Sequence, residues 1–412
     1  MKKRILIVLQ SLPFPLNSGG RQGVFSCIEA IKDDLDVFLT CYNDPNADFA
    51  KNKLAKIWPN ITILPYTLNK RKAEKSFLVK KFYKKIASKI FHNNANWHMD
   101  DIIDNRFNHF YAEYYEYINN LITSYDIDIV QLEFMGNISL FYSLPEKVKK
   151  VFVHHELGYI KDELLFKAKG FNTPYDKYIL NLTRCNELDT LSHFDAVITH
   201  SSIDTQKLID DGVRTNVFTS FSMVKLKGEQ IPITSFKKRL TFIGPENHFP
   251  NKDGVTWFLN EVWPILKQHD NDWQFDIIGK WSAETKLFIE KKYDGVHCLG
   301  FVNELSAVLK ESIMIVPIRI GSGIRMKLLE ASNLGIPFVS TTVGAEGLPF
   351  KHKQDCLLAD SVDSFVECIL AMKELPLQRK LANNAYKMIK ETFSKDKLKE
   401  TRLVVYNKIF NQ

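Results

Sequence analysis

Short apolar runs alternate with amphipathic stretches along most of the chain, a pattern typical of parallel strands joined by helices. In the first half, strands are predicted over residues 4–10, 36–42, 61–66, 128–134, 150–156, 195–201 and 217–222, and helices over about 24–32, 174–192 and 203–211. In the second half, strands are predicted over residues 239–245, 273–280, 296–301, 313–318 and 337–340, and helices over 254–268, 282–292 and 303–310. Three further helices are expected to close the chain. The pattern predicts an α/β fold with one parallel sheet in each half.

Residues 67–125 interrupt this alternation, because their pattern is helical and predicts no strand. Within them, the lysines and arginines of residues 70–91 alternate with apolar side chains at helical spacing, and an aromatic run follows at residues 107–117. This insertion either packs as an extra helical pair or brings apolar side chains to a substrate cleft or to lipid. The polar segment after residue 222 is the predicted linker between the halves.

The stretch 312–347 carries the densest candidate chemistry. Its first strand is followed by a loop and a helix, expected to end at Gly335, which together contain Arg319, Gly321, Ser322, Gly323, Arg325, Lys327 and Glu330. Glycines let backbone N–H groups approach an anion, and the start of a helix adds partial positive charge. The cationic side chains suit a diphosphate, and the carboxylate suits a ribose diol. The alternative is a tight turn with a surface ion pair between Lys327 and Glu330.

Two other loops of the second half are expected at the same edge of the sheet. The strand over residues 337–340 runs into a turn, and the strand over residues 239–245 runs into a loop. The candidate ligand-binding residues of these two segments are Thr342, Gly344, Glu346, Gly244, Asn247 and Asn251. Because ligands of open α/β sheets bind outside the carboxyl ends of the strands, we expect all these loops to meet at one site.

In the first half, the strand over residues 150–156 ends in His154, His155 and Glu156. A histidine at the carboxyl end of a strand can take a proton or bind a hydroxyl, because it titrates near neutral pH. Adjacent strand residues point to opposite faces, so the two histidines are predicted to differ in role. His154, His155 and Glu156 are therefore the catalytic candidates at this strand end. A structural capping role is the alternative.

The segment before the first helix contains Gly19, Gly20 and Arg21. We expect these glycines in a loop just ahead of the helix, where a phosphate or substrate could approach closely, although a plain turn has the same composition. The GxGxxG fingerprint is missing from this first strand–loop–helix. A nicotinamide-dependent enzyme is therefore disfavoured.

Composition narrows the class of protein. The chain has 412 residues, 45% of them hydrophobic and 25% charged, which suits two globular domains with full cores. No apolar run approaches the roughly 18–20 residues of a membrane-spanning helix. The short apolar run near the N-terminus is interpreted as a strand, not a signal peptide. Six scattered cysteines without a CxxC pair argue against zinc and disulfides and favour a reducing cytoplasm.

The net charge is +7, and much of it lies in residues 70–91. One interpretation is the solvated face of a helix packed on its own domain. Another is docking on an anionic membrane surface. Nucleic-acid binding is disfavoured, because no recognised nucleic-acid module accompanies the charge.

The segment RIGSGIRMKLLEASNLGIPFVSTTVGAEGL, residues 319–348, resembles the donor-binding segment of GT-B glycosyltransferases of the family 4 (group 1) type. Residues 242–266 resemble the first strand–loop–helix of the same domain, and the first half is similar only in outline. The resemblance implies an acceptor-side Rossmann-like domain over residues 1–222 with its insertion at about 67–125, a nucleotide-sugar domain over 239–394, and a helix over 395–412 that crosses back. Many members carry two glutamates separated by seven residues. Glu330 matches the second, and Ser322 stands in place of the first.

The resemblance implies a retaining glycosyltransferase, of hexosyltransferase type, acting in polysaccharide biosynthesis. It would move a sugar from a UDP- or GDP-linked donor to a hydroxyl of a glycan or lipid-linked glycan, without a cofactor or metal ion. In the family, a histidine at the position of His155 lies near the donor sugar, and the loop of Gly19 and Gly20 lies under the donor phosphates. We expect a cytoplasmic enzyme, either free or peripheral at the inner face of the membrane. The alternatives are a nucleotide-sugar epimerase of GT-B fold and a catalytically silent subunit of a glycan assembly complex.

Overall fold

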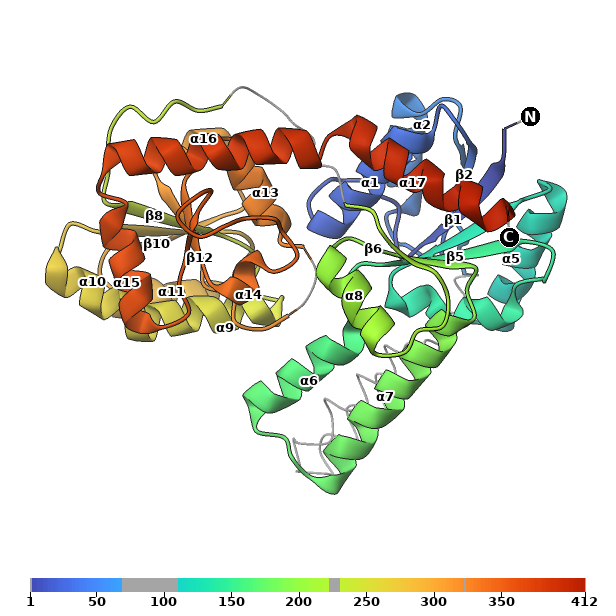
Figure 1. Cartoon of the computed structure of the whole chain (residues 1–412), viewed down its shortest axis with the longest axis horizontal. Coiled ribbons are helices and arrows are strands. Elements are labelled where there is room, and N and C mark those ends of the chain that lie inside the picture. Colours follow the sequence, from blue (N-terminus) through green and yellow to red (C-terminus); the bar gives the residue numbers. More distant parts are fainter. Residues whose placement is uncertain (1, 69–109, 222–229, 322–323, 412) are drawn as a thin grey trace. The chain divides into compact units, whose positions relative to one another are not determined.

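The computed structural model describes residues 2–68, 110–221, 230–321 and 324–411. They form two compact units, each built on its own parallel sheet (Figure 1). The first unit comprises Met1–Thr199, Thr205–Ser220 and Lys399–Gln412, and the second comprises His200–Asp204 and Phe221–Leu398. The basic residues 70–91 and two of the candidate donor-binding residues, Ser322 and Gly323, lie outside the described residues.

The sheet of the first unit has seven parallel strands in the order β3-β2-β1-β4-β5-β6-β7. They are β1 (Arg4–Leu9), β2 (Asp36–Cys41), β3 (Thr62–Ile63), β4 (Ile129–Glu133), β5 (Lys149–His154), β6 (Ala196–Thr199) and β7 (Val217–Thr219). The central strands are buried on both faces, which explains why they are apolar runs in the sequence. The strand order reverses between β1 and β4, and in such sheets ligands bind outside the carboxyl ends of the strands at this reversal.

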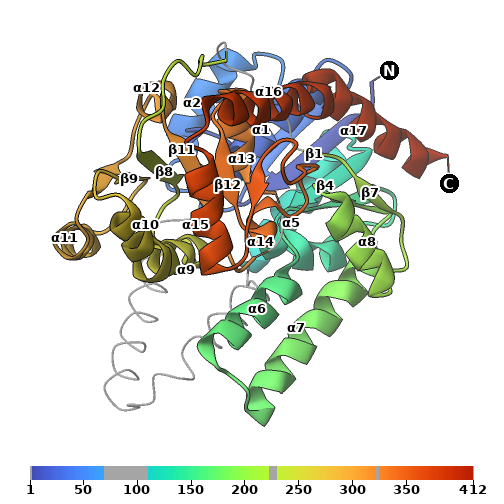
Figure 2. The same cartoon turned by 60° about the vertical axis from the view of Figure 1, so that its left-hand side comes forward.

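Helices cover both faces of this sheet. They are α1 (Gly19–Ile31), α2 (Ala47–Ile57), α5 (Ala112–Ser124), the 3-10 segment η1 (Met135–Ser143), α6 (Gly158–Lys169), α7 (Pro174–Ser192), α8 (Ser202–Asp210) and α17 (Lys395–Phe410). Figures 1 and 2 show α6 and α7 side by side as a helical hairpin, and α7 begins with a capping box at Thr173. Of the predicted insertion, the structure describes its two ends, and the C-terminal end contains α5.

The start of α1 corrects one prediction. The helix begins at Gly19 and not near residue 24, so Gly19 and Gly20 belong to its first turn and not to a loop ahead of it. Ser18 lies in extended conformation and its side chain accepts the backbone N–H of Arg21, which is the geometry of a helix N-cap. The cap, and not the first apolar residue, therefore decides where this helix begins.

The sheet of the second unit has six parallel strands in the order β10-β9-β8-β11-β12-β13. They are β8 (Arg239–Ile243), β9 (Gln274–Ile278), β10 (Val296–Gly300), β11 (Ile313–Val316), β12 (Phe338–Ser340) and β13 (Leu357–Leu358). Its helices are α9 (Phe249–Trp257), η2 (Phe258–Val262), α10 (Trp263–His269), α11 (Ala283–Lys292), α12 (Leu305–Leu309), α13 (Met326–Asn333), α14 (Thr342–Ala345), α15 (Val362–Ala371) and α16 (Leu375–Thr392). The strand order reverses between β8 and β11, so this sheet also has a ligand-binding edge.

The helix predicted over residues 254–268 begins earlier, at Phe249, and is interrupted. Its middle turn, η2, is a π-helix, and α10 follows with Pro264 in its first turn. Proline has no backbone N–H, so a regular helix cannot continue through this position without losing a hydrogen bond.

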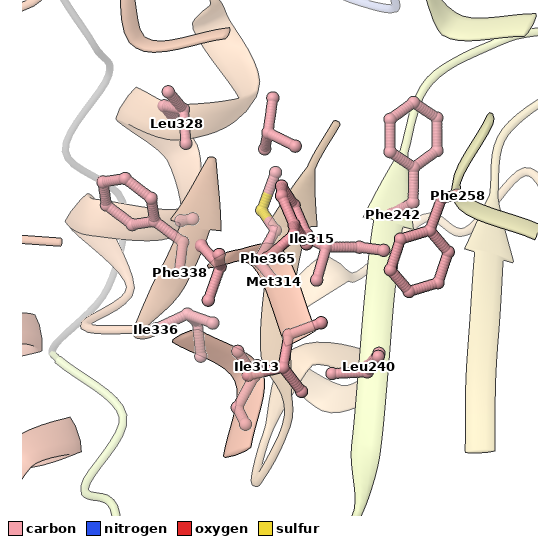
Figure 3. Close-up of a cluster of buried hydrophobic side chains, with 14 of the residues drawn as sticks. Leu240, Phe242, Phe258, Ile313, Met314, Ile315, Leu328, Ile336, Phe338 and Phe365 are labelled. Carbon is pink, nitrogen blue, oxygen red and sulfur yellow. The ribbon is translucent and has the colours of Figure 1, made fainter. Parts of the chain in front are cut away.

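The core of the second unit fixes the helix that carries the candidate donor-binding residues. Figure 3 shows Leu328 of α13 in one cluster with apolar side chains of β8, β11 and β12. Leu240, Phe242, Phe258, Ile313, Met314, Ile315, Ile336, Phe338 and Phe365 are the other labelled members of this buried cluster. On its other side, α13 packs against α16. Burial of this apolar face holds the polar residues of α13 in one position.

The C-terminal helix α17 is attached to the first unit by polar contacts. Lys399 Nζ lies 2.8 Å from Asp34 Oδ2, and the hydroxyls of Ser220 and Thr401 are 2.9 Å apart. The predicted fold class, with two parallel sheets and a closing helix that returns to the first unit, is confirmed. In the described part of the chain, none of the helices has the length and apolar character needed to cross a membrane.

Candidate active site

The first cluster of candidate residues lies at the carboxyl ends of β4 and β5. His155 follows directly after β5, and its Nε2 is 2.5 Å from Oε2 of Glu133, the last residue of β4. The imidazole stacks on Phe134, with 3.8 Å between the ring centroids. The side chain of Glu133 is 2% exposed and that of His155 is 15% exposed. The structure therefore holds His155 rigidly, on two sides, at the edge where a ligand is expected.

Phe134 connects this cluster to the start of α1. Its φ is 68°, which is uncommon for a bulky residue. A Cβ added to Gly20 would lie 3.1 Å from the ring of Phe134, so a glycine is needed for the first turn of α1 to approach this closely. Arg21, in the same turn, donates hydrogen bonds to Ser11 and Asn17. The ring of Phe134 thus contacts both the first turn of α1, which contains the predicted glycine pair, and the imidazole of His155.

His154 points away from this cluster. Its Nε2 is 2.8 Å from Oε1 of Glu187 in α7, and both side chains are fully buried. Glu187 also accepts the backbone N–H groups of Gly158 and Tyr159, each at 3.0 Å, and so caps the start of α6. The structural interpretation considered for the pair of histidines applies to His154. Glu156 is bound to Lys161, 2.8 Å away.

The second cluster lies in the second unit, at the carboxyl ends of β8 and β11. Lys327 Nζ donates to Asn251 Oδ1 at 2.8 Å and lies 4.2 Å from the centroid of the Phe242 ring. Asn251 donates in turn to the carbonyl of Pro245 at 3.0 Å. A Cβ on Gly244 would come within 2.6 Å of Asn251 Nδ2, so this glycine makes room for the amide. Of the residues that the structure describes, Asn251 and not Glu330 is the hydrogen-bond partner of Lys327.

The electrostatics of Lys327 suit an anion. Its pKa is lowered to about 7, chiefly by burial and also by the neighbouring guanidinium of Arg325, while Glu330 raises it. Further negative charge beside the ammonium would favour its charged form. A bound phosphate would supply that charge and return the lysine to its cationic form.

Arg325 is the N-cap residue of α13 and belongs to the same cluster. Gly321 has a φ of +120°, and a Cβ on it would lie 3.0 Å from Arg325 Nη2. Burial and Asp204 raise the pKa of Glu346, and Arg325 lowers it, which indicates that Glu346 faces the same positive charge. Arg325, Lys327, Glu330 and Glu346 therefore form one group of interacting charges around the start of α13.

The other predicted donor-binding residues have structural partners or lie at the surface. Arg319 forms a two-point ion pair with Asp253, at 3.1 and 2.8 Å, and lies over the ring of Trp257. Thr342 uses its N–H and its hydroxyl to bind Asp360. Thr341 caps α14 by accepting the N–H of Gly344, and Asn247 is exposed.

Sequence reasoning missed Glu133. A glutamate at the end of a strand that is otherwise buried and apolar is the signal that could have found it, because a buried carboxylate needs a hydrogen-bond partner. Within the described residues there is no group of three or more His, Cys, Asp or Glu side chains that could hold a metal ion.

Comparison with known proteins gives a family match for part of the chain and a relative of similar length. Residues 237–374 match the model of the family described as Glycosyl transferases group 1. A protein of Klebsiella pneumoniae, described as an uncharacterized 44.6 kDa protein in the cps region, is 23% identical over 412 residues, covering 96% of this chain and 97% of that protein.

Two solved structures share the fold over almost the whole chain. S. aureus TarM, in complex with fondaparinux, alpha-GlcNAc-glycerol and UDP, superposes with a TM-score of 0.69 at 14% identity, covering 98% of this chain and 100% of that one. Anabaena HepE, in complex with UDP and glucose, superposes with a TM-score of 0.62 at 11% identity, covering 98% and 99%.

The two sheets and the returning C-terminal helix have the fold of these GT-B structures. Residues 237–374 match the group 1 glycosyl transferase model, so the predicted resemblance of the second unit is confirmed.

Proposed function

We propose that the protein transfers a sugar, with retention of anomeric configuration, from a nucleoside-diphosphate sugar to a hydroxyl of a glycan or lipid-linked glycan. The observation that carries this proposal is Lys327. It is held by Asn251 beside Arg325 at the start of a helix, and its pKa is lowered to about 7. A buried lysine with a lowered pKa beside an arginine, at the ligand-binding edge of a parallel sheet, suits a diphosphate.

The chemistry follows from that placement. As the bond between sugar and diphosphate breaks, negative charge builds on the outer phosphate. Arg325, Lys327 and the first turn of α13 stabilise this charge, which is electrostatic catalysis without a protein nucleophile. The proton of the acceptor hydroxyl goes to the leaving phosphate or to a side chain. Neither a metal ion nor a cofactor has a part in this scheme.

The other candidates take supporting roles. Glu330 accepts hydrogen bonds from the ribose diol, and His155 contacts the transferred sugar. Arg319 and Thr342 act on the donor indirectly, since their charge and hydroxyl are bound to Asp253 and Asp360 and shape the loops after β11 and β12.

Relatives support the substrate classes. The TarM and HepE structures both contain UDP, which favours a uridine donor over a guanosine donor. The Klebsiella relative lies in a cps region, which favours cell-surface polysaccharide as the product. We place the enzyme in the cytoplasm. The basic sequence of residues 70–91 would attach it to the anionic inner face of the membrane.

Isothermal titration of the protein with UDP, GDP and ADP tests the proposal. We expect UDP to bind, and the Lys327→Met variant to bind it at least tenfold more weakly, since a charge-assisted contact contributes about 1.5–3 kcal/mol. Lys292→Met, on the exposed face of α11, is the matched control. If none of the three nucleotides binds, the proposal is wrong.

Donor consumption separates the competing activities. A transferase consumes UDP-sugar at its full rate only when an acceptor is present, whereas an epimerase of the same fold converts it without one. Binding of UDP with no turnover over a broad panel of donors and acceptors would favour a silent subunit.

A further inference from the structure

The proposed mechanism uses His155 but gives no role to the polar residues behind it. Gln131 and Glu133 lie in β4, and Arg402 and Tyr406 lie in α17; all four are fully buried in the first unit. Burying polar groups costs free energy unless they are hydrogen-bonded, so a cluster of buried polar residues indicates a specific role. Tyr406, Gln131 and Glu133 form a chain of hydrogen bonds that starts at α17 and ends at His155.

Every link of this chain is short. Tyr406 Oη donates to Gln131 Oε1 at 2.5 Å, and Gln131 Nε2 donates to Glu133 Oε1 at 2.6 Å. The second oxygen of Glu133 binds His155 Nε2 at 2.5 Å. In Figure 1, α17, which carries Tyr406, lies along the elements of the first unit that contain the other members.

The donors and acceptors of the chain have one consistent assignment. A carboxylate only accepts, so the amide nitrogen of Gln131 must face Glu133. The amide oxygen of Gln131 then faces Tyr406, which donates to it. Glu133 receives the remaining hydrogen bond from His155, so the ring carries its proton on Nε2. Any contact between His155 and a substrate hydroxyl is therefore made by Nδ1.

The titratable groups that face this chain come from α17 and α1. Arg402 of α17 interacts electrostatically with Glu133 and with the thiol of Cys27 in α1. Burial raises the pKa of Cys27 to about 11, so this thiol stays neutral at physiological pH. Glu133 thus has a buried cation on one side and the imidazole on the other.

We propose that Glu133 is a positioning residue that fixes the tautomer of His155, and that Tyr406 of α17 orients Gln131, which holds Glu133 in place. The tautomer itself does not depend on what the enzyme transfers. Its consequence for turnover rests on the proposed function, in which His155 contacts the sugar.

The substitution Glu133→Gln gives this proposal a specific signature. Gln131 still presents its N–H2 to position 133, because Tyr406 holds its oxygen, so the new amide must turn its oxygen to Gln131. Its own N–H2 then faces His155, whose Nε2 can only accept that hydrogen bond as a bare nitrogen. We expect the ring to change from the Nε2–H to the Nδ1–H tautomer. A histidine in the wrong tautomer cannot do its task, as catalytic triads illustrate.

The double variant Glu133→Gln/Tyr406→Phe should reverse the change. Without the tyrosine hydroxyl, Gln131 is able to flip and offer its oxygen to the amide at position 133. That amide then turns its own oxygen to His155, and the Nε2–H tautomer returns. Tyr406→Phe alone should leave the tautomer unchanged, because the carboxylate of Glu133 still demands a donor from both sides.

Nitrogen-15 spectra of histidine-labelled full-length protein, recorded above the titration of the imidazoles, measure the tautomer. The His155 signals are assigned by their loss in His155→Gln. Glu187→Gln is the control and should alter the signals of His154 but not those of His155. We expect kcat to fall about 10²-fold or more in Glu133→Gln with little change in KM, and to recover partly in the double variant.

Two results would overturn the proposal. One is an Nδ1–H tautomer of His155 in the unsubstituted protein. The other is an unchanged ring in folded Glu133→Gln. If Glu133→Gln does not fold, Gln131→Leu, which removes the bond that orients Glu133, must alter the His155 signals. If Glu133→Gln changes the His155 tautomer but the protein binds no nucleotide, this inference stands and the proposed function is rejected.

Discussion

Two histidine–glutamate pairs lie on opposite sides of the end of β5, and they differ in what the carboxylate holds. Glu187 binds His154 and two backbone N–H groups of α6 inside the protein, and both side chains of that pair are fully buried. Glu133 binds His155 and Gln131 at the edge of the sheet, and the imidazole is partly exposed. The same two residue types therefore serve as a helix cap on one side and as an oriented imidazole on the other.

A parallel contrast occurs in the second unit. Arg319 is bound at two points by Asp253, whereas Lys327 has an amide as its hydrogen-bond partner and a pKa lowered to about 7. A charged group that is satisfied within the protein shapes the fold. A charged group held by neutral partners is ready for a ligand that brings the opposite charge.

The largest effect is expected for His155. His155→Ala should lower kcat by about 10²–10⁴-fold, the usual contribution of a positioned proton acceptor or hydrogen-bond partner, and leave UDP affinity unchanged. His154→Ala is the matched control and should lower stability more than turnover. Steady-state kinetics with a panel of acceptors, together with thermal unfolding, compare the two. If the variants exchange behaviour, the assignment of roles to the two faces of β5 is reversed.

The cationic residues of the second unit come next. Arg325→Ala should weaken UDP binding by about 1.5–3 kcal/mol, because one charge-assisted hydrogen bond is lost. Arg319→Gln should have a smaller effect, since that guanidinium is already neutralised by Asp253. Calorimetry gives both values. Equal losses in the two variants would remove the distinction between Arg319, whose charge is paired with Asp253, and Arg325.

Removing the cap of α6 is expected to lower the stability of the protein without affecting UDP binding. Glu187→Ala leaves two backbone N–H groups and His154 without their acceptor, each unsatisfied buried group costing about 1–3 kcal/mol. We expect a lower Tm and a lower midpoint in urea, with UDP affinity unchanged. A loss of UDP affinity in a folded Glu187→Ala protein would contradict a purely structural role for this pair.

The smallest effect concerns pH. Because the pKa of Lys327 is lowered to about 7, this lysine is largely neutral at higher pH. UDP binding above pH 7 therefore requires uptake of a proton from the solvent. UDP affinity should fall as pH rises from about 7 to 9, and this dependence should vanish in Lys327→Met. In the unfolded chain this lysine keeps its ordinary pKa of 10.5 and binds more protons above pH 7, so its burial costs stability at neutral pH.

That cost gives a second measurement on the same variant. Lys327→Met should raise the Tm of the ligand-free protein, or leave it unchanged, at the same time as it weakens UDP binding. A residue that the fold needed would behave in the opposite way. A lower Tm in Lys327→Met would place Lys327 among the structural residues.

Several features could be read from the sequence because they depend on neighbours along the chain. The apolar runs of β4, β5 and β11 predict buried parallel strands, and the segment from Gly321 to Glu330 predicts a glycine loop that leads into a cationic helix. Opposite faces for His154 and His155 follow from the alternation of side chains in a strand. These are local properties of the backbone and of hydrophobic periodicity, and the structure reproduces the strands, the helix and the two faces.

Other features depend on residues far apart in the sequence, and only the tertiary structure decided them. Glu133 meets His155 because β4 pairs with β5, and Tyr406 reaches Gln131 because the chain returns to the first unit after the second is complete. The low pKa of Lys327 arises from burial beside Arg325. No local pattern encodes such distances, since hydrogen bonds and desolvation are set by which elements pack together. The sequence by itself therefore determined the class of enzyme and the edges where the candidate residues lie, and the packing determined which side chains these residues contact.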